Sequence, residues 1–331
     1  MAYKEKTSTT IFENCRCPHC SNPNAGNDFT SAIGSYMCST NLERMARQTA
    51  ATRNRVLHYP STMFVMRHSE RMDDMFHDWT KYFNDDTKPY TPFDLNMPPT
   101  LPVNRPVDHY RLDPMLTRTG GVIAQLCGRA FLYRGYTPDV IYSSPALRSL
   151  QTARFIRTAS RSEALIRVEP GLFENLSLYD TKPLLVTEEQ QSLFGVDPYY
   201  MPQYEFDEIY KKRESNEDYN ERMKIVLRRI VTTAESTSGK NKNELIVLVV
   251  GHASTVDMGV GLLRDKPRPS THSNLFKISR KIPYCSTICL QPKPTAKVTS
   301  NVPWEPVFGT IPPITYTGFT NKPDYAFLLR K

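Results

Sequence analysis

The chain has 331 residues, of which 39% are hydrophobic and 23% are charged. This composition excludes a small disulfide-bonded scaffold and predicts a packed core in one or two domains. The 42 Lys and Arg residues against 34 Asp and Glu residues give a net charge of +8. Such a balance suits acidic or phosphorylated partners, but it is too mild and too evenly spread to indicate nucleic-acid binding.

Residues 1–60 differ in composition from the rest of the chain. They are rich in Ser, Thr and Asn, and they end in a basic stretch at 41–57 that is compatible with a helix. The start lacks the apolar core of a signal peptide, and the longest apolar run, Leu245–Val250, is too short to span a membrane. We therefore expect an N-terminal extension at 1–60 and one domain at 61–331, in the cytosol and away from membranes.

The extension contains a cluster of candidate zinc ligands: Cys15, Cys17, His19, Cys20 and Cys38. Cys17 and Cys20 have the spacing of a zinc knuckle. The usual second C-x-x-C pair is missing, so a flexible tail with reduced thiols is the favoured alternative. Cys285 and Cys289 belong to no recognisable motif.

From residue 61 onward, short apolar runs alternate with stretches of helical periodicity. Four runs predict strands: Met63–Met66, Val140–Tyr142, Leu165–Val168 and Leu245–Val250. The first and last are almost uninterrupted apolar strings, as expected for strands that are buried on both faces of a parallel sheet. Three stretches predict helices: Gly120–Tyr133, Ala146–Thr158 and Tyr219–Glu235. The alternation predicts an α/β fold with a mostly parallel central sheet flanked by helices.

Two stretches lack periodicity, namely 89–106 and 180–207. Both are rich in proline, which the chain uses 26 times against 14 glycines. Proline removes a backbone donor and fixes φ, so it favours stiff, irregular connections. We expect both stretches to be insertions that cover the edge or mouth of the sheet.

The residues that follow the predicted strands carry charge and imidazole. Arg67, His68 and Arg71 follow the first strand, Arg148 begins the helix after the second, Glu174 comes shortly after the third, and His252 follows the fourth: an ordered set at successive strand ends. In open α/β sheets ligands bind beyond the carboxyl ends of the strands. Taken singly, each residue has a structural interpretation, as a hydrogen-bonded histidine, a helix cap or a loop carboxylate. Together they predict a site.

The chemistry that uses this set of side chains is phosphoryl transfer through a histidine. A neutral imidazole nitrogen is a competent nucleophile, and arginine forks match phosphoryl oxygens and stabilise their charge. A second histidine can donate another hydrogen bond, while a carboxylic acid protonates the leaving group and then activates water. The positive side chains make a metal or other cofactor unnecessary.

These residues lie in segments that resemble a known family. The run Phe64–Asp73, which contains Arg67-His68-Ser69-Glu70-Arg71, resembles the RHG signature of the histidine phosphatase (phosphoglycerate mutase-like) superfamily. Its extended form is similar to the branch of the suppressors of T-cell receptor signalling, whose members carry ubiquitin-associated and Src-homology domains. Further segments resemble that branch: Asp94–Pro98, Tyr142–Ala153, Ile166–Glu174, Val250–Ser254 and Lys281–Tyr284. The similarity extends from about Thr62 to near the C-terminus and does not include residues 1–60.

The resemblance implies a role for each matching residue. His68 is then the phosphorylated nucleophile and Glu174 the proton donor, while the phosphate pocket consists of Arg67, Arg71, Arg148 and His252. Arg67 and His252 also count among the catalytic residues. The resemblance further implies a parallel-dominated sheet with the site at its carboxyl edge, homodimer formation, and phosphotyrosine proteins or phosphorylated steroids as substrates.

Two positions depart from the family pattern. Ser69 replaces the glycine of RHG, which allows close backbone approach to phosphate. A serine is tolerated if its backbone stays in an ordinary region, and its hydroxyl could then bond to phosphate. Asn175 replaces the aromatic residue that follows the acid, which puts substrate choice in question. We favour an active phosphatase of phosphoproteins or small phosphomonoesters. The alternatives are a pseudophosphatase that binds phosphorylated partners and, less attractively, a mutase acting on small sugar or glycerate phosphates.

Overall fold

The structure is a computed structural model that describes residues 62–83, 89–237, 240, 244–264, 277, 280–292, 304–316, 319–320 and 323–329. Apart from Tyr133–Gly135, these residues belong to one compact unit. The predicted helix at 41–57 and the cysteine cluster lie outside the described residues. The boundary between residues 60 and 61 therefore stays a prediction.

A six-stranded sheet forms the centre of this unit, with the strand order β3-β2-β4-β1-β5-β6. Four strands are mutually parallel: β1 (Thr62–Arg67), β2 (Val140–Ser143), β3 (Ile166–Val168) and β4 (Ile246–Gly251). Strands β5 (Thr287–Pro292) and β6 (Trp304–Val307) extend the sheet in antiparallel fashion beyond β1. The predicted mostly parallel α/β fold is confirmed. The two antiparallel strands at its edge were not predicted.

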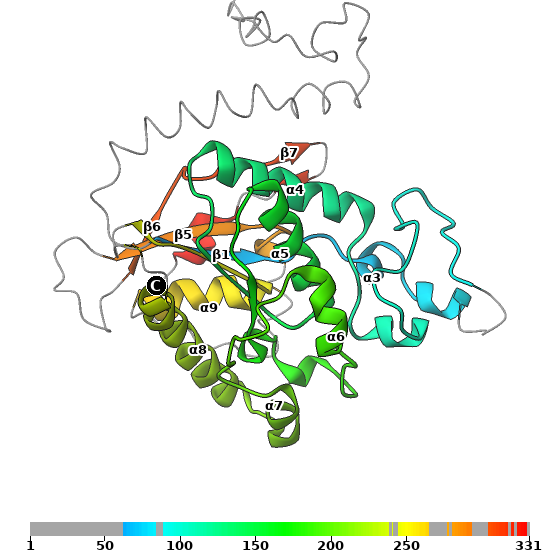
Figure 1. Cartoon of the computed structure of the whole chain (residues 1–331). Coiled ribbons are helices and arrows are strands. Elements are labelled where there is room, and N and C mark those ends of the chain that lie inside the picture. The colour runs from blue at the N-terminus through cyan, green and yellow to red at the C-terminus, as the bar shows by residue number, and fades with distance from the viewer. Residues whose placement is uncertain are drawn as a thin grey trace, which may run out of the picture. The chain divides into compact units, whose positions relative to one another are not determined.

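Helices cover both faces of the sheet (Figure 1). Along β1, Phe64 and Met66 pack on one face, in the cluster that includes residues of α4 (Arg118–Tyr133) and α5 (Leu147–Ala159). Met63 and Val65 pack on the opposite face with α8 (Asn216–Thr237) and α9 (Ala253–Leu263). Each fully buried side chain of this size contributes roughly 1.5–3 kcal/mol. Because both faces are covered, Met63–Met66 of β1 and Ile246–Val250 of β4 are all apolar.

The three predicted helices are confirmed with shifted ends, since the ends of α4, α5 and α8 lie within three residues of the predicted bounds. The third strand begins at Ile166 rather than Leu165. Short elements that periodicity did not predict are α3 (Met72–Met75), η2 (Trp79–Phe83), η3 (Val107–Arg111), η4 (Pro170–Leu172), η5 (Leu176–Leu178), α7 (Phe206–Lys212), β7 (Thr315–Tyr316), β8 (Phe319–Thr320) and α11 (Tyr325–Leu328).

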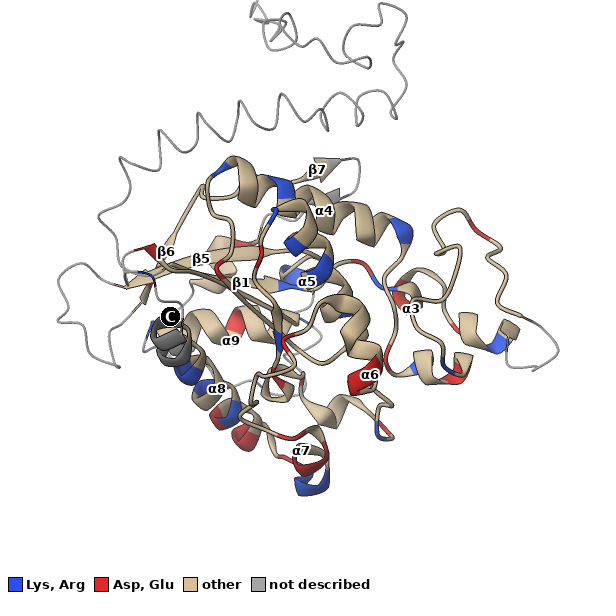
Figure 2. Ribbon diagram, in the orientation of Figure 1, with Lys and Arg blue, Asp and Glu red and all other residues tan. Residues whose placement is uncertain are grey.

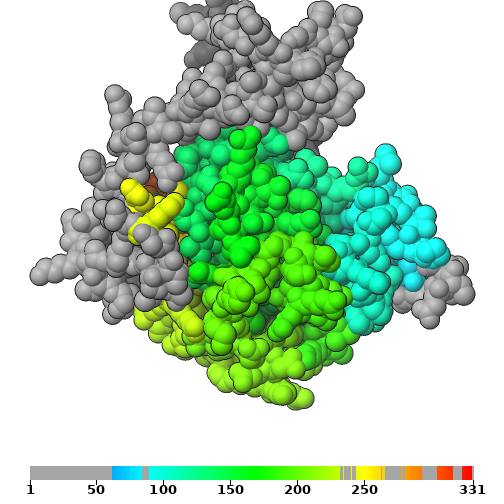
Figure 3. Space-filling model, in the orientation of Figure 1, coloured from blue at the N-terminus to red at the C-terminus, as the bar shows by residue number. Residues whose placement is uncertain are grey.

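Both proline-rich stretches are largely irregular, as predicted. Residues 89–106 form turns and bends and bury Met97 and Val103 against the core. Residues 180–207 include only the short helices α6 (Glu188–Gln191) and η6 (Ser192–Phe194) before α7 begins. In the view of Figure 3, green residues from this part of the chain form much of the visible surface. Among the described residues, no helix is both long enough and apolar enough to cross a membrane.

Candidate active site

The predicted site residues meet at the carboxyl edge of the parallel strands. Arg67 is the last residue of β1 and pairs in register with Gly251 at the end of β4. The next residue of each strand is a histidine, so His68 and His252 come together with ring centroids 5.5 Å apart. Adjacent parallel strands therefore place the two imidazoles side by side, although they are 184 positions apart in the sequence.

A cavity of 470 Å³ opens at this edge. Five of the six predicted side chains line it: Arg67, His68, Arg71, Arg148 and Glu174. His252 is not among the lining residues and lies fully buried in contact with Arg148. The remaining wall includes Arg111, Leu112, Pro114, Leu178 and Tyr179.

His68 is held as a neutral imidazole with a defined orientation. Its Nδ1 lies 2.8 Å from the carbonyl oxygen of Ser69, and because a carbonyl can only accept, Nδ1 carries the proton. Burial lowers the pKa of His68 well below its usual value, and the positive charges of Arg148 and Arg67 lower it further. The unprotonated Nε2 is thus the nitrogen available to the cavity, which is the state that a nucleophile requires.

Arg148 connects the other side chains of the site. It is fully buried in the first turn of α5, and its Nη2 donates to Oε1 of Glu174, to the hydroxyl of Tyr179 at 3.1 Å and toward Nδ1 of His252 at 3.3 Å. Its Nε and Nη1 are buried and make no hydrogen bond within the described part of the chain. Buried donors without partners are costly, so these two groups indicate where an anion completes the site.

Glu174 follows the short η4 turn, which comes directly after β3. Burial opposes its ionisation, but His252, Arg148 and Arg71 outweigh burial and lower the pKa of Glu174 to about 2. The carboxyl is therefore ionised while the cavity holds no anion. A phosphate dianion placed between Glu174 and the arginines offsets their positive charge and raises the pKa of Glu174, which lets the carboxyl carry a proton when a substrate is bound.

Ser144 and Thr255 hold His252 in its orientation. Its Nε2 lies 2.9 Å from the hydroxyl oxygen of Ser144, at the end of β2, and its backbone N–H donates to Oγ1 of Thr255. Burial is the main cause that lowers the pKa of His252 to about 3. Because Nδ1 then accepts from Arg148, Nε2 carries the proton and donates to Ser144. In this state His252 supports Arg148 rather than donating into the cavity.

Arg67 and Arg71 are restrained by different neighbours. Nη1 of Arg67 donates to the carbonyl oxygen of Ile282 at 2.6 Å, and its guanidinium lies 4.3 Å from the ring centroid of Tyr284. Burial and the nearby Arg71 lower the pKa of Arg67 to about 10. Arg71 forms ion pairs with Asp73 at 3.1 Å and Asp74 at 2.6 Å, so two carboxylates hold it at the mouth of the cavity.

The two departures from the family pattern point away from the cavity. Ser69 is fully buried, its hydroxyl donates to the carbonyl oxygen of Gly120 at 2.7 Å, and its backbone φ is not positive. The idea that this hydroxyl bonds to phosphate is therefore wrong for this arrangement. Asn175 is buried as well, and its side chain accepts from the backbone N–H of Ser177 and donates to Asn216.

Three site residues escaped the sequence analysis as functional candidates: Ser144, Tyr179 and Tyr284. Ser144 and Tyr284 lie inside the quoted motifs, so their position offered a signal, but nothing in the sequence marks Tyr179. In Figure 2, α4 and α5 carry only basic residues and α6 only acidic ones, whereas α7 and α8 carry both. Within the described ranges, no three His, Cys, Asp or Glu side chains gather in an arrangement that could hold a metal ion.

Comparison with known proteins identifies a family and several relatives. The family model described as histidine phosphatase superfamily (branch 1) matches residues 106–295. The ecdysteroid-phosphate phosphatase of Drosophila melanogaster is 34% identical over 232 residues, which cover 68% of this chain and 29% of that protein. The human ubiquitin-associated and SH3 domain-containing protein A is 32% identical over 231 residues, which cover 67% of this chain and 34% of that protein. This chain therefore corresponds to about a third of the length of these curated relatives.

A solved structure shares the fold. The crystal structure of the ecdysone phosphate phosphatase from Bombyx mori, in complex with tungstate, aligns with a TM-score of 0.64 and 27% identity. The alignment covers 81% of this chain and all of that one. Together with the sequence matches, it confirms both the resemblance that the motifs predicted and the expected fold.

Proposed function

Because the chain belongs to the histidine phosphatase superfamily, we propose that it is a metal-independent phosphatase that hydrolyses phosphomonoesters through a phosphohistidine intermediate. The observation that carries the proposal is the pairing of a neutral, oriented His68 with a buried Arg148 whose Nε and Nη1 lack partners among the described residues. One group supplies the nucleophile and the other the donors for phosphoryl oxygens, at the same cavity.

In the first step, Nε2 of His68 attacks phosphorus and the bond from phosphorus to the ester oxygen breaks. Arg67, Arg71 and Arg148 hold the phosphoryl oxygens, where preorganised donors stabilise the charge of the transition state. Glu174 gives its proton to the departing oxygen. Nη2 of Arg148 donates to Oε1 of Glu174, so one guanidinium links the acid to the phosphoryl group.

In the second step, the Glu174 carboxylate takes a proton from a water molecule that attacks the phosphohistidine. The bond between phosphorus and Nε2 breaks, inorganic phosphate leaves, and His68 returns to its neutral state. His252, hydrogen-bonded to Ser144, keeps Arg148 in place through both steps. The phosphoryl group in the cavity raises the pKa of Glu174 above its low value in the site without an anion, and this makes the carboxylate a better base for the second step.

For the substrate we propose an aryl phosphate and, more specifically, phosphotyrosine in a protein. The wall beyond the phosphate pocket combines the apolar Leu112, Pro114 and Leu178 with the ring of Tyr179, a surface suited to a phenyl ring. Arg111 at the same wall offers a charge for acidic flanking residues. The names of the insect relatives raise phosphorylated steroids as the alternative substrate class.

The test is hydrolysis of para-nitrophenyl phosphate in the presence of EDTA, with the native protein and His68→Ala. We expect turnover in the native protein and none above background in the variant. Absence of turnover in both proteins would overturn the proposal and favour a pseudophosphatase that binds phosphorylated partners. Comparing phosphotyrosine peptides with a steroid phosphate would then separate the two substrate classes by kcat/KM.

Location and assembly belong to the same proposal. Cys127, Cys285 and Cys289 are free thiols in the described residues, in keeping with the reducing cytosol. A homodimer is inferred from the family resemblance, and sedimentation of the pure protein tests it.

A further inference from the structure

The segment that follows Glu174 folds back onto it. Asn175 caps the 3-10 turn Leu176–Leu178, because its side chain accepts from the backbone N–H of Ser177 at 2.9 Å. The same side chain donates to Oδ1 of Asn216, at the start of α8, at 2.7 Å. The turn that Asn175 fixes returns Tyr179 to the carboxyl of Glu174, five residues earlier in the chain.

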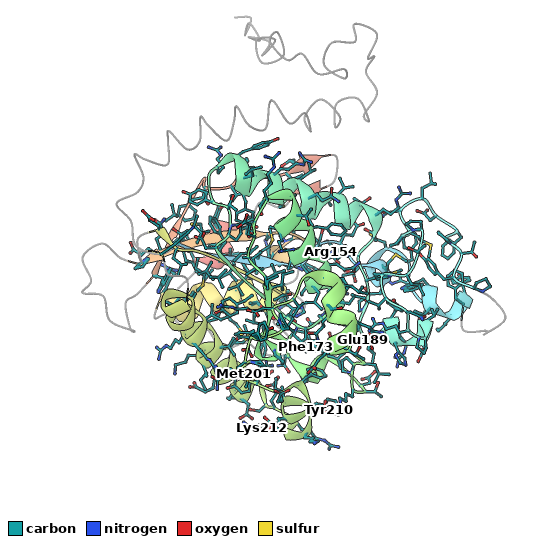
Figure 4. All side chains as sticks on the ribbon, viewed as in Figure 1. Arg154, Phe173, Glu189, Met201, Tyr210 and Lys212 are labelled. Atoms are coloured by element: carbon teal, nitrogen blue, oxygen red, sulfur yellow. The ribbon has the colours of Figure 1, made fainter. Side chains whose placement is uncertain are left out.

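The Tyr179 hydroxyl joins the acid and its arginine. It donates to Oε1 of Glu174 at 2.5 Å and accepts from Nη2 of Arg148 at 3.1 Å. Burial is the main cause that raises the pKa of Tyr179 above its usual value, so the hydroxyl keeps its proton and remains a donor at neutral pH. The ring is fixed by packing against Phe173, with centroids 5.5 Å apart, and Figure 4 labels Phe173 among the interior side chains.

The two oxygens of the Glu174 carboxyl consequently differ. Oε1 accepts from both Tyr179 and Arg148. Oε2 makes no hydrogen bond to the described residues, and Nδ1 of His252 lies 3.8 Å from it, beyond hydrogen-bond distance. One oxygen is thus occupied by fixed donors, while the other is left for a mobile proton.

We propose that Tyr179 is a positioning residue that holds Oε1 of Glu174, so that Oε2 is the oxygen that exchanges the proton with the leaving group and then with water. This inference rests on the proposed phosphatase function and assigns a determinant of its proton transfer that the family motifs do not contain. A hydrogen bond to the ionised carboxyl stabilises that form. Tyr179 therefore also helps to set the pH at which Glu174 changes its protonation state.

Tyr179→Phe removes the hydroxyl and keeps the ring that packs on Phe173. Losing one charge-assisted hydrogen bond raises the pKa of Glu174, by about one unit. Glu174 acts as acid in the first step and as base in the second. Whichever step limits kcat, the limb of the pH profile that Glu174 controls moves to higher pH by about one unit.

The matched control is Tyr210→Phe. Tyr210 lies on α7 (Figure 4) and packs against the same small cluster around Phe173 and Ile209, but it does not line the cavity. We expect its pH profile to coincide with that of the native protein. A purely structural role of Tyr179 would instead lower the melting temperature and the rate while leaving the pH limb in place, which would overturn the proposal.

A second measurement does not depend on turnover. The Glu174 carboxyl is titrated by 13C NMR in native protein and Tyr179→Phe, with Glu174→Gln to assign its signal. Both proteins are saturated with inorganic phosphate, which raises the pKa of Glu174 out of the acid range in which the fold loses stability. A rise of about one pH unit in the midpoint supports the proposal, and coincident titrations overturn it even if the native protein is active. An inactive native protein with a shifted titration would instead count against the phosphatase function and leave the role of Tyr179 standing.

Discussion

The cavity has two ends that are built in different ways. The phosphate end is formed by Arg67, His68 and Arg148. These residues lie at the end of a strand or in the first turn of the helix that follows one. The leaving-group end, formed by Leu112, Pro114, Leu178 and Tyr179, stands on turns between elements. Parallel strands fix the first end through backbone pairing, whereas the Asn175 side-chain cap fixes the turn that carries Leu178 and Tyr179 at the second. From this difference we infer that the strand ends determine the reaction and that the turns determine the choice of substrate.

Arg148 connects the two ends, so its replacement gives the largest expected effect. Arg148→Lys keeps a positive charge but loses the planar fork that reaches Glu174, Tyr179 and the phosphoryl oxygens. We expect kcat/KM to fall about 10²- to 10³-fold, the usual cost of losing a preorganised donor. Arg154→Lys, an exposed arginine on the same helix (Figure 4), should behave like the native protein. A decrease in kcat/KM of less than tenfold for Arg148→Lys would contradict the central role of Arg148 in the site.

Gly120 tests how tightly the phosphate end is supported. An added Cβ at this helical position would lie 2.5 Å from the backbone oxygen of Glu70, one residue beyond Ser69. Gly120→Ala must therefore displace the loop that carries His68, and we expect it to lower the free energy of unfolding by about 1–3 kcal/mol. Urea titration measures this.

Gly259→Ala in α9 is the matched control. Its Cβ would meet side chains no closer than 3.5 Å, and helix propensity favours alanine by up to about 1 kcal/mol. We expect this variant to be as stable as the native protein or more so. Equal destabilisation by both substitutions would show that the contact with Glu70 is not what restricts position 120.

The sequence predicted the phosphate end because strand ends in a parallel sheet must converge. Apolar runs located β1 and β4, and the residues after them could then be placed at one edge. The leaving-group end could not be predicted in this way, since the path of a turn depends on caps such as Asn175, whose partner Asn216 lies 41 residues away. Strands β5 and β6 were missed for a related reason. TICLQP mixes apolar and polar residues, and its strand character comes from pairing with β1.

The histidines make the stability of the folded protein dependent on pH. Burial lowers the pKa of His252 to about 3 and that of His68 well below its usual 6.5. Below pH 6.5 the unfolded chain takes up protons that the folded chain does not, so stability falls as the pH falls toward 3. Each histidine contributes a slope of at most about 1.4 kcal/mol per pH unit.

His252→Asn should therefore flatten the decline in unfolding free energy between pH 6.5 and pH 4. Urea titrations at several pH values give the slope, and the exposed His77 provides a matched histidine-to-asparagine control. An unchanged slope in His252→Asn would mean that His252 is protonated in the folded state. In that case it could donate into the cavity, and the phosphate end would hold one more cation than the hydrogen bonds indicate.

Ser69→Gly gives the smallest expected effect and bears directly on the pseudophosphatase alternative. The backbone N–H of Ser69 donates to Oγ1 of Thr152 at 3.0 Å, which fixes the loop without help from the side chain. The hydroxyl donates a hydrogen bond to the carbonyl oxygen of Gly120, so its removal lowers the free energy of unfolding by about 1 kcal/mol. Because φ is not positive, the position gains nothing from a glycine, and kcat/KM should stay within about threefold of the native value. A gain of tenfold or more in para-nitrophenyl phosphate hydrolysis would show instead that serine obstructs the phosphate end, and the native chain would then be better described as a binder of phosphorylated partners.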